Sequence, residues 1–216
     1  MNAGAGQPHM NPTGRLRNGL HYGWIILVVA TLVAFGALGL ARFGYSVLLP
    51  AMQADLGMGN TEAGFLATAH VIGYLVASLI GGALASRFGP RRVITVGLAI
   101  AGSSMLMTGL AGDYAEIALW RGLAGVGSGM SNIPIYGVLA AWFGTRRRGL
   151  ATGIAVSGAS VAFIALGPLV PIVLDEFGSL GWRICWYGFG GFTIFLAVTG
   201  AWLLRNQPQD KGLQAI

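Results

Sequence analysis

Charge is scarce in this sequence of 216 residues. Only 9% of its residues are charged and 55% are hydrophobic, whereas a typical soluble domain carries about 25% charged residues. The mean hydropathy is correspondingly high, at +0.69. A chain with so little charge cannot cover a water-exposed fold with polar surface, so we expect it to lie in a lipid bilayer.

Cysteine is nearly absent, and the basic residues, although in excess, form no continuous face. The single Cys185 excludes an internal disulfide and supplies no metal-ligand spacing, so we expect neither a metal nor a cofactor. The net charge is +6, but the 13 basic residues are scattered in small groups among apolar runs. This pattern argues against nucleic acid as a partner.

The sequence is rich in long apolar runs. A membrane helix needs roughly 20 mostly apolar residues, and six stretches qualify: about 23–50, 62–85, 92–112, 115–143, 150–174 and 182–204. The first stretch is too long for a cleaved signal peptide. We therefore predict an all-α membrane protein with six transmembrane helices at 22–205, a cytoplasmic tail at 1–21, and a second tail or the start of a linker at 206–216.

Arginine and lysine accumulate at alternate loops of these spans. They lie before span one, between spans two and three, between four and five, and after six: Arg15, Arg17, Arg87, Arg91, Arg92, Arg146, Arg147, Arg148, Arg205 and Lys211. Six of the seven acids lie in the other loops. Because basic residues near span ends stay in the cytoplasm, both termini are predicted to be cytoplasmic. Four tryptophans near span ends are expected to be interface anchors: Trp24, Trp142, Trp182 and Trp202.

The segment from Gly81 to Arg92 is the most informative one. Glycines suited to close packing lead into a short hydrophilic turn with three arginines, and another apolar run follows at once. This order predicts a tight cytoplasmic turn between two membrane helices. In span five, Pro168 lacks a backbone donor and follows Gly167, which predicts a place where the helix can bend.

These segments resemble the major facilitator superfamily of transporters. The turn matches its loop signature, roughly GxLaDRxGRR, at Gly82, Leu84, Arg87, Gly89, Arg91 and Arg92, while Ser86 takes the place of the usual aspartate. The run from Arg121 to Gly129 is similar to the fourth-helix motif, RxxxGxGxG, and Gly158 with Gly167 and Pro168 to the fifth-helix pattern. The triplet from Gly181 to Arg183 is common at the start of the sixth helix.

The resemblance covers about residues 22–205 and implies one half of a secondary transporter that works by alternating access. Such transporters have two six-helix halves, each a 3+3 inverted repeat, and this chain is similar to the amino-terminal half. The implied partners are a small solute, the lipid bilayer, and a second six-helix half or a like subunit. The opening Tyr22 to Trp24 and the run from Arg42 to Pro50 look like bacterial transporters of the monocarboxylate-related and sugar-efflux-like groups. That resemblance implies a bacterial inner membrane and a carboxylate solute, with Arg42 as the anion contact. The resemblance also implies a cytoplasmic gating loop and a helix-five hinge, at Gly82, Ser86, Arg87, Gly89, Arg91 and Arg92 and at Gly158, Gly167 and Pro168 respectively.

Polar residues on three spans predict where a solute binds. The helical period places each set on or near one face of its span, and a rise of 1.5 Å per residue puts Arg42, His70 and Arg121 at similar depth in the outer half. Three basic-capable side chains would suit an anion, because the planar guanidinium group matches a carboxylate. The substrate-binding candidates are Arg42, Tyr45, His70, Tyr74, Arg121, Asn132 and Tyr136.

Each assignment has an alternative. An arginine can snorkel or cap carbonyls of a neighbouring helix, His70 can be a packed residue, and small pairs such as Gly125 with Gly129 or Gly149 with Gly153 can serve close packing alone. None of the acids lies deep in a span, so His70 is the only deep group that titrates near neutrality.

Alternative functions are a sugar or drug efflux carrier half, and a non-transporting fragment or scaffold that needs a second half. An enzyme is not expected. The segment Ala155 to Gly158 resembles the serine motif of membrane proteases, but no histidine follows Ser157 to act as its base.

Overall fold

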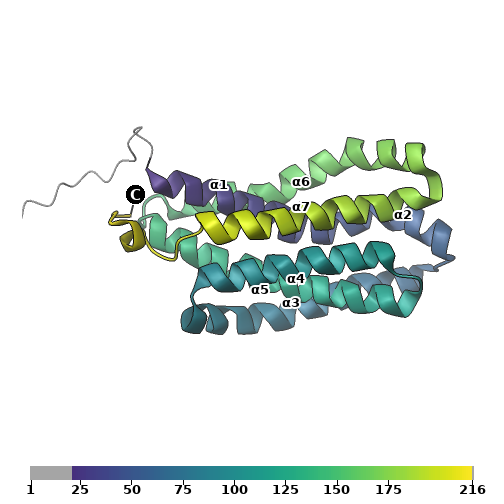
Figure 1. Cartoon of the computed structure of the whole chain (residues 1–216), viewed down its shortest axis with the longest axis horizontal. Helices are drawn as coiled ribbons and strands as arrows, with labels where there is room; N and C mark the ends of the chain where they lie inside the picture. The colour runs from purple at the N-terminus through teal and green to yellow at the C-terminus, as the bar shows by residue number, and fades with distance from the viewer. Residues whose placement is uncertain (1–20, 216) are drawn as a thin grey trace, which may run out of the picture.

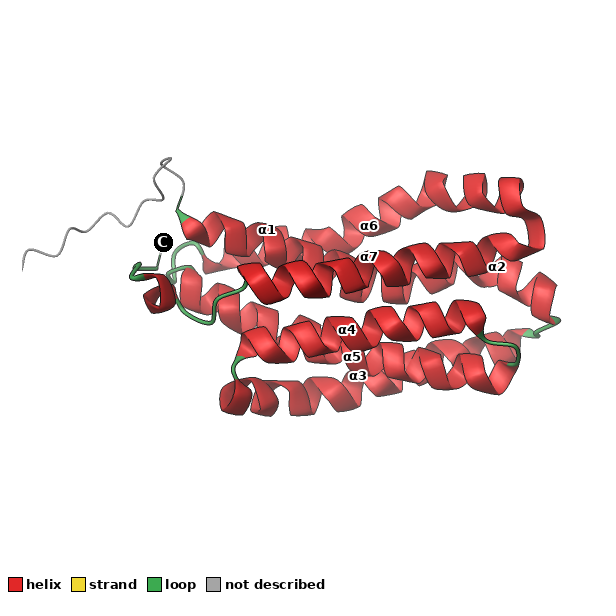
Figure 2. Ribbon diagram, in the orientation of Figure 1, coloured by secondary structure: helices red, strands yellow, loops and turns green. Residues whose placement is uncertain are grey.

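The structure is a computed structural model that describes residues 21–215. The predicted tail with Arg15 and Arg17 therefore lies outside the described residues, apart from His21. Long helices run side by side along one axis (Figure 1), and the described residues contain helices and loops but no strand (Figure 2). The α-helices are α1 (Tyr22–Ala34), α2 (Gly44–Leu56), α3 (Asn60–Phe88), α4 (Pro90–Leu110), α5 (Tyr114–Trp142), α6 (Arg148–Phe177) and α7 (Gly181–Leu203).

The first helical rod contains a change of helix type. Residues Tyr22–Leu56 are one continuous helix, but its middle, η1 (Phe35–Phe43), is a π-helix. There the backbone bonds reach five residues back, as in the bond from the Gly44 N–H to the Gly39 carbonyl. Such segments are rare and frequently lie at functional sites. Two short 3₁₀-helices, η2 (Gly178–Leu180) and η3 (Pro208–Lys211), complete the described elements.

The helices coincide with the predicted spans to within a few residues, except that the first rod continues to Leu56, beyond its predicted end at residue 50. By length and hydropathy, four described segments could cross a membrane: Tyr22–Leu56, Asn60–Phe88, Pro90–Leu110 and Arg148–Leu203. The last of these contains both α6 and α7, and α5 is not among them. The all-α, apolar fold is confirmed, whereas the number of crossings stays a prediction.

Basic and acidic residues near the helix ends gather at opposite ends of the bundle. Gly89, residues 143–147 and residues 204–213 lie at one end, which we call the arginine end, and the connections at 57–59, 111–113 and η2 lie at the other, the acidic end (Figure 1). Acids at the acidic end cap helices: the Asp113 carboxylate accepts the Glu116 N–H at 2.9 Å, and Glu62 accepts the Gly59 N–H at 2.8 Å. These acids therefore start helices, because their oxygens satisfy otherwise free N–H groups.

Small residues bring the helices into backbone contact. A Cβ added at Gly125 of α5 would lie 2.0 Å from the His70 carbonyl oxygen of α3, and one at Gly129 would lie 2.5 Å from that of Tyr74. The predicted packing role of this pair is confirmed. For Gly149 and Gly153 of α6 it is wrong within the described chain, because a Cβ at either would meet nothing within 4 Å.

The buried apolar side chains form two clusters, one toward each end of the bundle. Trp142 belongs to the cluster at the arginine end and Trp182 to the other. Both rings are 0% exposed, and their Nε1 groups donate to the Arg205 carbonyl and the Asp55 carboxylate at 3.1 and 2.9 Å. These two are therefore not the interface anchors we expected, whereas Trp24 and Trp202 are exposed.

Much of α3 and α6 is left uncovered. Within the most apolar window of each candidate span, only 28% of residues are buried in Asn60–Phe88 and in Arg148–Leu203, against 61% in the first rod. Many of the exposed residues are large and apolar, for example Leu79 and Ile164. These two helices thus present surface that lipid or another membrane-spanning partner must cover.

Candidate functional site

Arg121 lies buried at the junction of three elements. Its side chain is 1% exposed, and its Nη1 donates to the Ala41 carbonyl of η1 at 2.7 Å. The guanidinium carbon lies 4.5 Å from the ring centre of Tyr45 and 5.3 Å from that of Trp186. The stacking and the carbonyl bond stabilise the cation, but its Nε has no hydrogen-bond partner among the described residues.

Arg42 and the buried His70 lie around Arg121, and the two arginines make this a cationic region. His70 is 1% exposed, and neither ring nitrogen has a hydrogen-bond partner within residues 21–215. The backbone of His70 packs against α5 one turn from Arg121, because a Cβ at Gly125 would lie 2.0 Å from the His70 carbonyl oxygen. Arg42, next to Ala41 in η1, is exposed. The structure therefore brings the three predicted basic residues together, two of them buried and one at the surface.

This region has no acid to neutralise it. All seven acids of the sequence lie at helix ends or in the segments between helices. A buried cation without a carboxylate is costly at membrane depth, and such groups tend to mark solute or ion pathways. The arrangement can therefore attract an anion, with Arg42 as the group that water or a solute reaches first.

Tyr74, Asn132 and Tyr136 form a separate hydrogen-bond chain. The Asn132 Nδ2 donates to the Tyr74 hydroxyl at 3.0 Å, and the Tyr136 hydroxyl donates to Asn132 Oδ1 at 3.2 Å. Asn132 is buried, whereas both tyrosines are half-buried. The chain links α3 to α5 and leaves the Tyr74 proton free for a further acceptor. Tyr45, by contrast, is 3% exposed and its hydroxyl donates to the Ala63 carbonyl at 2.8 Å, which makes it a support for Arg121.

Arg183 caps carbonyls of a neighbouring helix, which is the alternative role that we left open for arginines. Its Nη1 donates to the carbonyls of Gly109 and Ala111, at 3.0 and 2.6 Å, and so caps the end of α4. The guanidinium also stacks on the Trp182 ring at 4.2 Å. Arg121 has a similar role in part, because its Nη1 also donates to a carbonyl of a neighbouring helix.

The segment Gly82–Arg92 forms the last turns of α3 and the start of α4. Gly89 has φ of +85°, a conformation that favours glycine, and joins the two helices. The Arg91 guanidinium donates to the Ala201 carbonyl, and the Arg91 backbone N–H donates to Asn206 Oδ1 at 2.9 Å. The Ser86 hydroxyl donates to the Ala83 carbonyl of its own helix at 2.8 Å. Gly82, Arg87 and Arg92 remain exposed.

The predicted helix-five residues lie in two different surroundings. A Cβ at Gly158 would lie 2.1 Å from the Thr31 carbonyl oxygen, so this glycine allows α6 to contact α1. Gly167 and Pro168 lie on the exposed surface of α6, which is continuous to Phe177. The role of these three residues as a hinge stays a prediction.

Sequence reasoning missed two parts of this site. Trp186 is fully buried and forms the second face of the Arg121 stack, although its spacing of four from Trp182 placed it on the same helical face. The π-helix η1 has no signal in the sequence that we recognised. An apolar cavity of about 400 Å³ lies between η1, α6 and α7, is lined by residues such as Phe35 and Cys185, and has no charged residue in its lining.

The geometry defines an α-helical membrane protein with a cationic region inside its helices. Residues 27–215 match the family model of the Major Facilitator Superfamily, and the chain belongs to this family. It is therefore an integral membrane protein of a transporter family.

Relatives and solved structures agree with this assignment. The chain is 29% identical to human monocarboxylate transporter 11 and 28% identical to the probable sulfoacetate transporter SauU of Cupriavidus necator, over 85% and 87% of its residues. It spans only 38% and 42% of the length of those proteins. The proton:xylose symporter XylE of E. coli, at 16% identity, shares the fold with a TM-score of 0.74, over 89% of this chain and 47% of that one.

Proposed function

We propose that this chain forms the amino-terminal half of a secondary transporter that moves a small carboxylate anion by alternating access. The half would cross the membrane six times as a 3+3 inverted repeat, with residues 22–205 as the transmembrane domain and the arginine end in the cytoplasm of a bacterium. The relatives support this reading, because the two named above transport, or are named for, a monocarboxylate and a sulfonated acetate. The uncovered surfaces of α3 and α6 suit a second half or a like subunit.

One observation carries the choice of an anion. Arg42 is exposed beside buried Arg121 and His70, in a region where the sequence supplies no acid. A carboxylate would supply the missing negative charge, and the guanidinium fork would hold it through paired hydrogen bonds. Tyr74, Asn132 and Tyr136 would line the path of the solute, while Tyr45 would hold Arg121 in place.

Replacement of Arg42 by alanine is expected to weaken carboxylate binding by at least about tenfold. A hydrogen bond to a charged group contributes about 1.5–3 kcal/mol, and here the lost group is the exposed one. Binding of a small monocarboxylate to the chain in nanodiscs, measured by calorimetry, tests this. Ser46→Ala, at an exposed position one turn further along the same helix, is the matched control and should bind as the parent does. Unchanged binding in Arg42→Ala would remove Arg42 from the site.

Two other functions remain to be separated from this one. A sugar or drug efflux half would bind a neutral or cationic solute in preference to a carboxylate in the same calorimetric assay. A non-transporting fragment or scaffold would show no flux. Proteoliposomes that contain only these 216 residues test the latter, and flux of organic anions no greater than in empty vesicles would exclude autonomous transport.

A charge at Ser86 is expected to shift the conformational balance of a complete transporter that carries this half. The family signature has an aspartate here, and a carboxylate could pair with arginines across the interface between halves, whereas the serine hydroxyl is engaged with Ala83. Ser86→Asp should therefore favour the state closed at the arginine end. Labelling of engineered cysteines from each side of the membrane measures the balance. The control is Ser86→Asn, because asparagine has the shape of aspartate without its charge. Equal labelling in Ser86→Asp and parent would refute the expectation.

A further inference from the structure

A polar cavity opens between α4 and α7 at the arginine end, far from the cationic region described above. Its volume is about 830 Å³, and Arg91, Arg92, Thr95 and Asn206 contribute its polar lining. The first residues of α4 and the last residues of α7 meet here, because the two helices run antiparallel. Gly89, Arg91 and Arg92 of the predicted gating loop contribute to its lining.

Hydrogen bonds hold the walls of the cavity in place. The Arg91 guanidinium donates to the Ala201 carbonyl, and the Arg91 backbone N–H donates to Asn206 Oδ1. The Thr95 hydroxyl donates to the Arg91 carbonyl at 2.9 Å. Arg92 differs from Arg91, because it is exposed and its guanidinium has no hydrogen-bond partner within residues 21–215. A fixed polar wall thus surrounds one cation that is available to a ligand.

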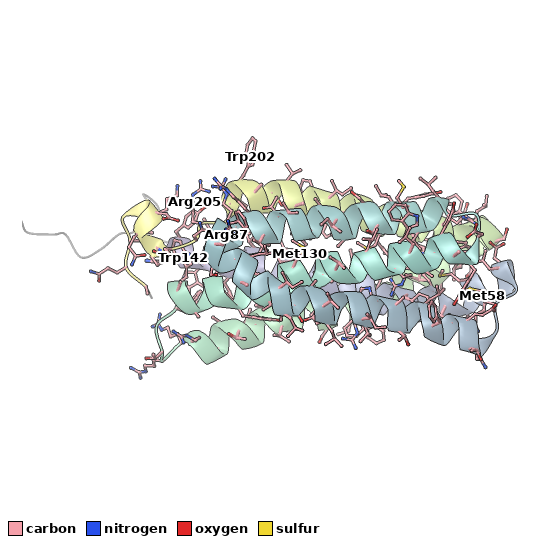
Figure 3. All side chains as sticks on the ribbon, turned by 90° about the horizontal axis from the view of Figure 1, so that it is seen from below. Met58, Arg87, Met130, Trp142, Trp202 and Arg205 are labelled. Carbon is pink, nitrogen blue, oxygen red and sulfur yellow. The ribbon has the colours of Figure 1, made fainter. Side chains whose placement is uncertain are left out.

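Further cations stand around the opening. Figure 3 shows Arg87 and Arg205 at the same end of the bundle as Trp202. Arg205 donates to the carbonyls of Trp202 and Leu204, both at 2.9 Å, which fixes it at the end of α7. The nearby acid is Asp210, whose carboxylate accepts the N–H groups of Asn206 and Gln207 at 3.1 and 3.2 Å. The four arginines outnumber it, so the opening is positively charged.

Apolar side chains extend from the cavity toward the middle of the membrane. Val96 of α4 lines the cavity and is 49% exposed, and along α7 Val198 is 54% and Trp202 76% exposed. Trp202 projects away from the bundle (Figure 3). A tryptophan at this level lies where the headgroups of a bilayer meet the acyl chains. The surface is therefore cationic at the membrane edge and apolar below it.

We propose that this cavity binds the phosphate headgroup of an anionic phospholipid, with Arg92 as the main contact and the acyl chains along Val96, Val198 and Trp202. Basic pockets between membrane helices bind anionic headgroups in this way. A free phosphate would use the arginines alone, whereas a phospholipid uses both the charge and the apolar strip. The site is distinct from the solute site and does not depend on which solute the protein moves.

Lipid retention in nanodiscs tests the proposal. The 216-residue chain is placed in phosphatidylcholine nanodiscs that contain a minority of phosphatidylglycerol, released into mild detergent, and its bound lipids are counted by native mass spectrometry. The parent is expected to retain phosphatidylglycerol in preference to phosphatidylcholine. Arg92→Gln should reduce this preference about fivefold, the contribution of one basic residue near an anionic surface, while Arg92→Lys should keep most of it.

The control removes the same charge at the same end. Arg146→Gln lies in the exposed connection between α5 and α6 and should leave the preference unchanged, and circular dichroism verifies that all variants are folded. No preference in the parent, or an equal loss in Arg92→Gln and Arg146→Gln, would overturn the proposal. Displacement of the lipid by millimolar inorganic phosphate would assign the site to a soluble phosphate and would overturn it too.

Discussion

Replacement of Gly125 by alanine is expected to destabilise the bundle by about 2 kcal/mol or more, although alanine is the better helix former. The added Cβ would lie 2.0 Å from the carbonyl oxygen of His70, so α3 and α5 would have to separate. Overpacking of this kind costs about 1–3 kcal/mol, and a backbone atom cannot move aside as a side chain does. The unfolding midpoint in detergent, followed by circular dichroism during titration with a denaturant, measures the loss.

Gly153→Ala is the matched control, with the opposite sign. Gly153 lies in the interior of α6, and a Cβ there meets nothing within 4 Å. Removal of glycine from a helix interior stabilises it by up to about 1 kcal/mol. A loss of stability in Gly153→Ala equal to that in Gly125→Ala would show that the contact with His70 is not the cause.

Replacement of Arg121 by methionine is expected to weaken anion binding without lowering the stability of the bundle. Methionine fills a similar volume between Tyr45 and Trp186. It also removes the cost of a buried charge that no acid neutralises, which offsets the loss of the hydrogen bond to the Ala41 carbonyl. The bundle should therefore unfold at the same denaturant concentration as the parent or a higher one. Binding of a monocarboxylate, measured by calorimetry in nanodiscs, should fall at least about tenfold, because a charged hydrogen-bond donor contributes about 1.5–3 kcal/mol.

Arg183→Met provides the comparison for this experiment. Arg183 is also an arginine that donates to helix carbonyls, but it caps α4 at the acidic end. Its replacement should lower stability by leaving the carbonyls of Gly109 and Ala111 without a donor, and should leave binding unchanged. If Arg121→Met kept its affinity and lost stability, Arg121 would be a structural residue like Arg183.

The positions of the helices and the close contact of α3 with α5 could be predicted from the sequence. Apolar length defines where a helix can span a bilayer, and glycines four residues apart allow backbones to meet. The same rule failed at Gly149 and Gly153, since small residues permit contact without supplying a partner. The inward orientation of Trp142 and Trp182 was also missed, because nearness to a span end does not reveal which way a ring points.

The candidate site was predictable in its members but not in their roles. Helical periodicity placed Arg42, His70 and Arg121 at one depth, and the structure brings them together. Periodicity alone could not show that Arg121 and His70 are buried while Arg42 is exposed. Burial depends on how neighbouring helices rotate and tilt, and those angles follow from contacts between residues far apart in the chain.

The sequence by itself determined that this protein is a helical membrane protein of the major facilitator superfamily, with the arginines of its loops at one end. Those properties follow from local quantities: apolar length, charge in each loop, and short motifs such as Gly89 to Arg92. Only the tertiary structure decided that η1 is a π-helix, that Trp186 stacks on Arg121, and that α4 and α7 enclose a basic cavity. Each of these needs two or more helices packed against one another, and packing is a property of the whole bundle.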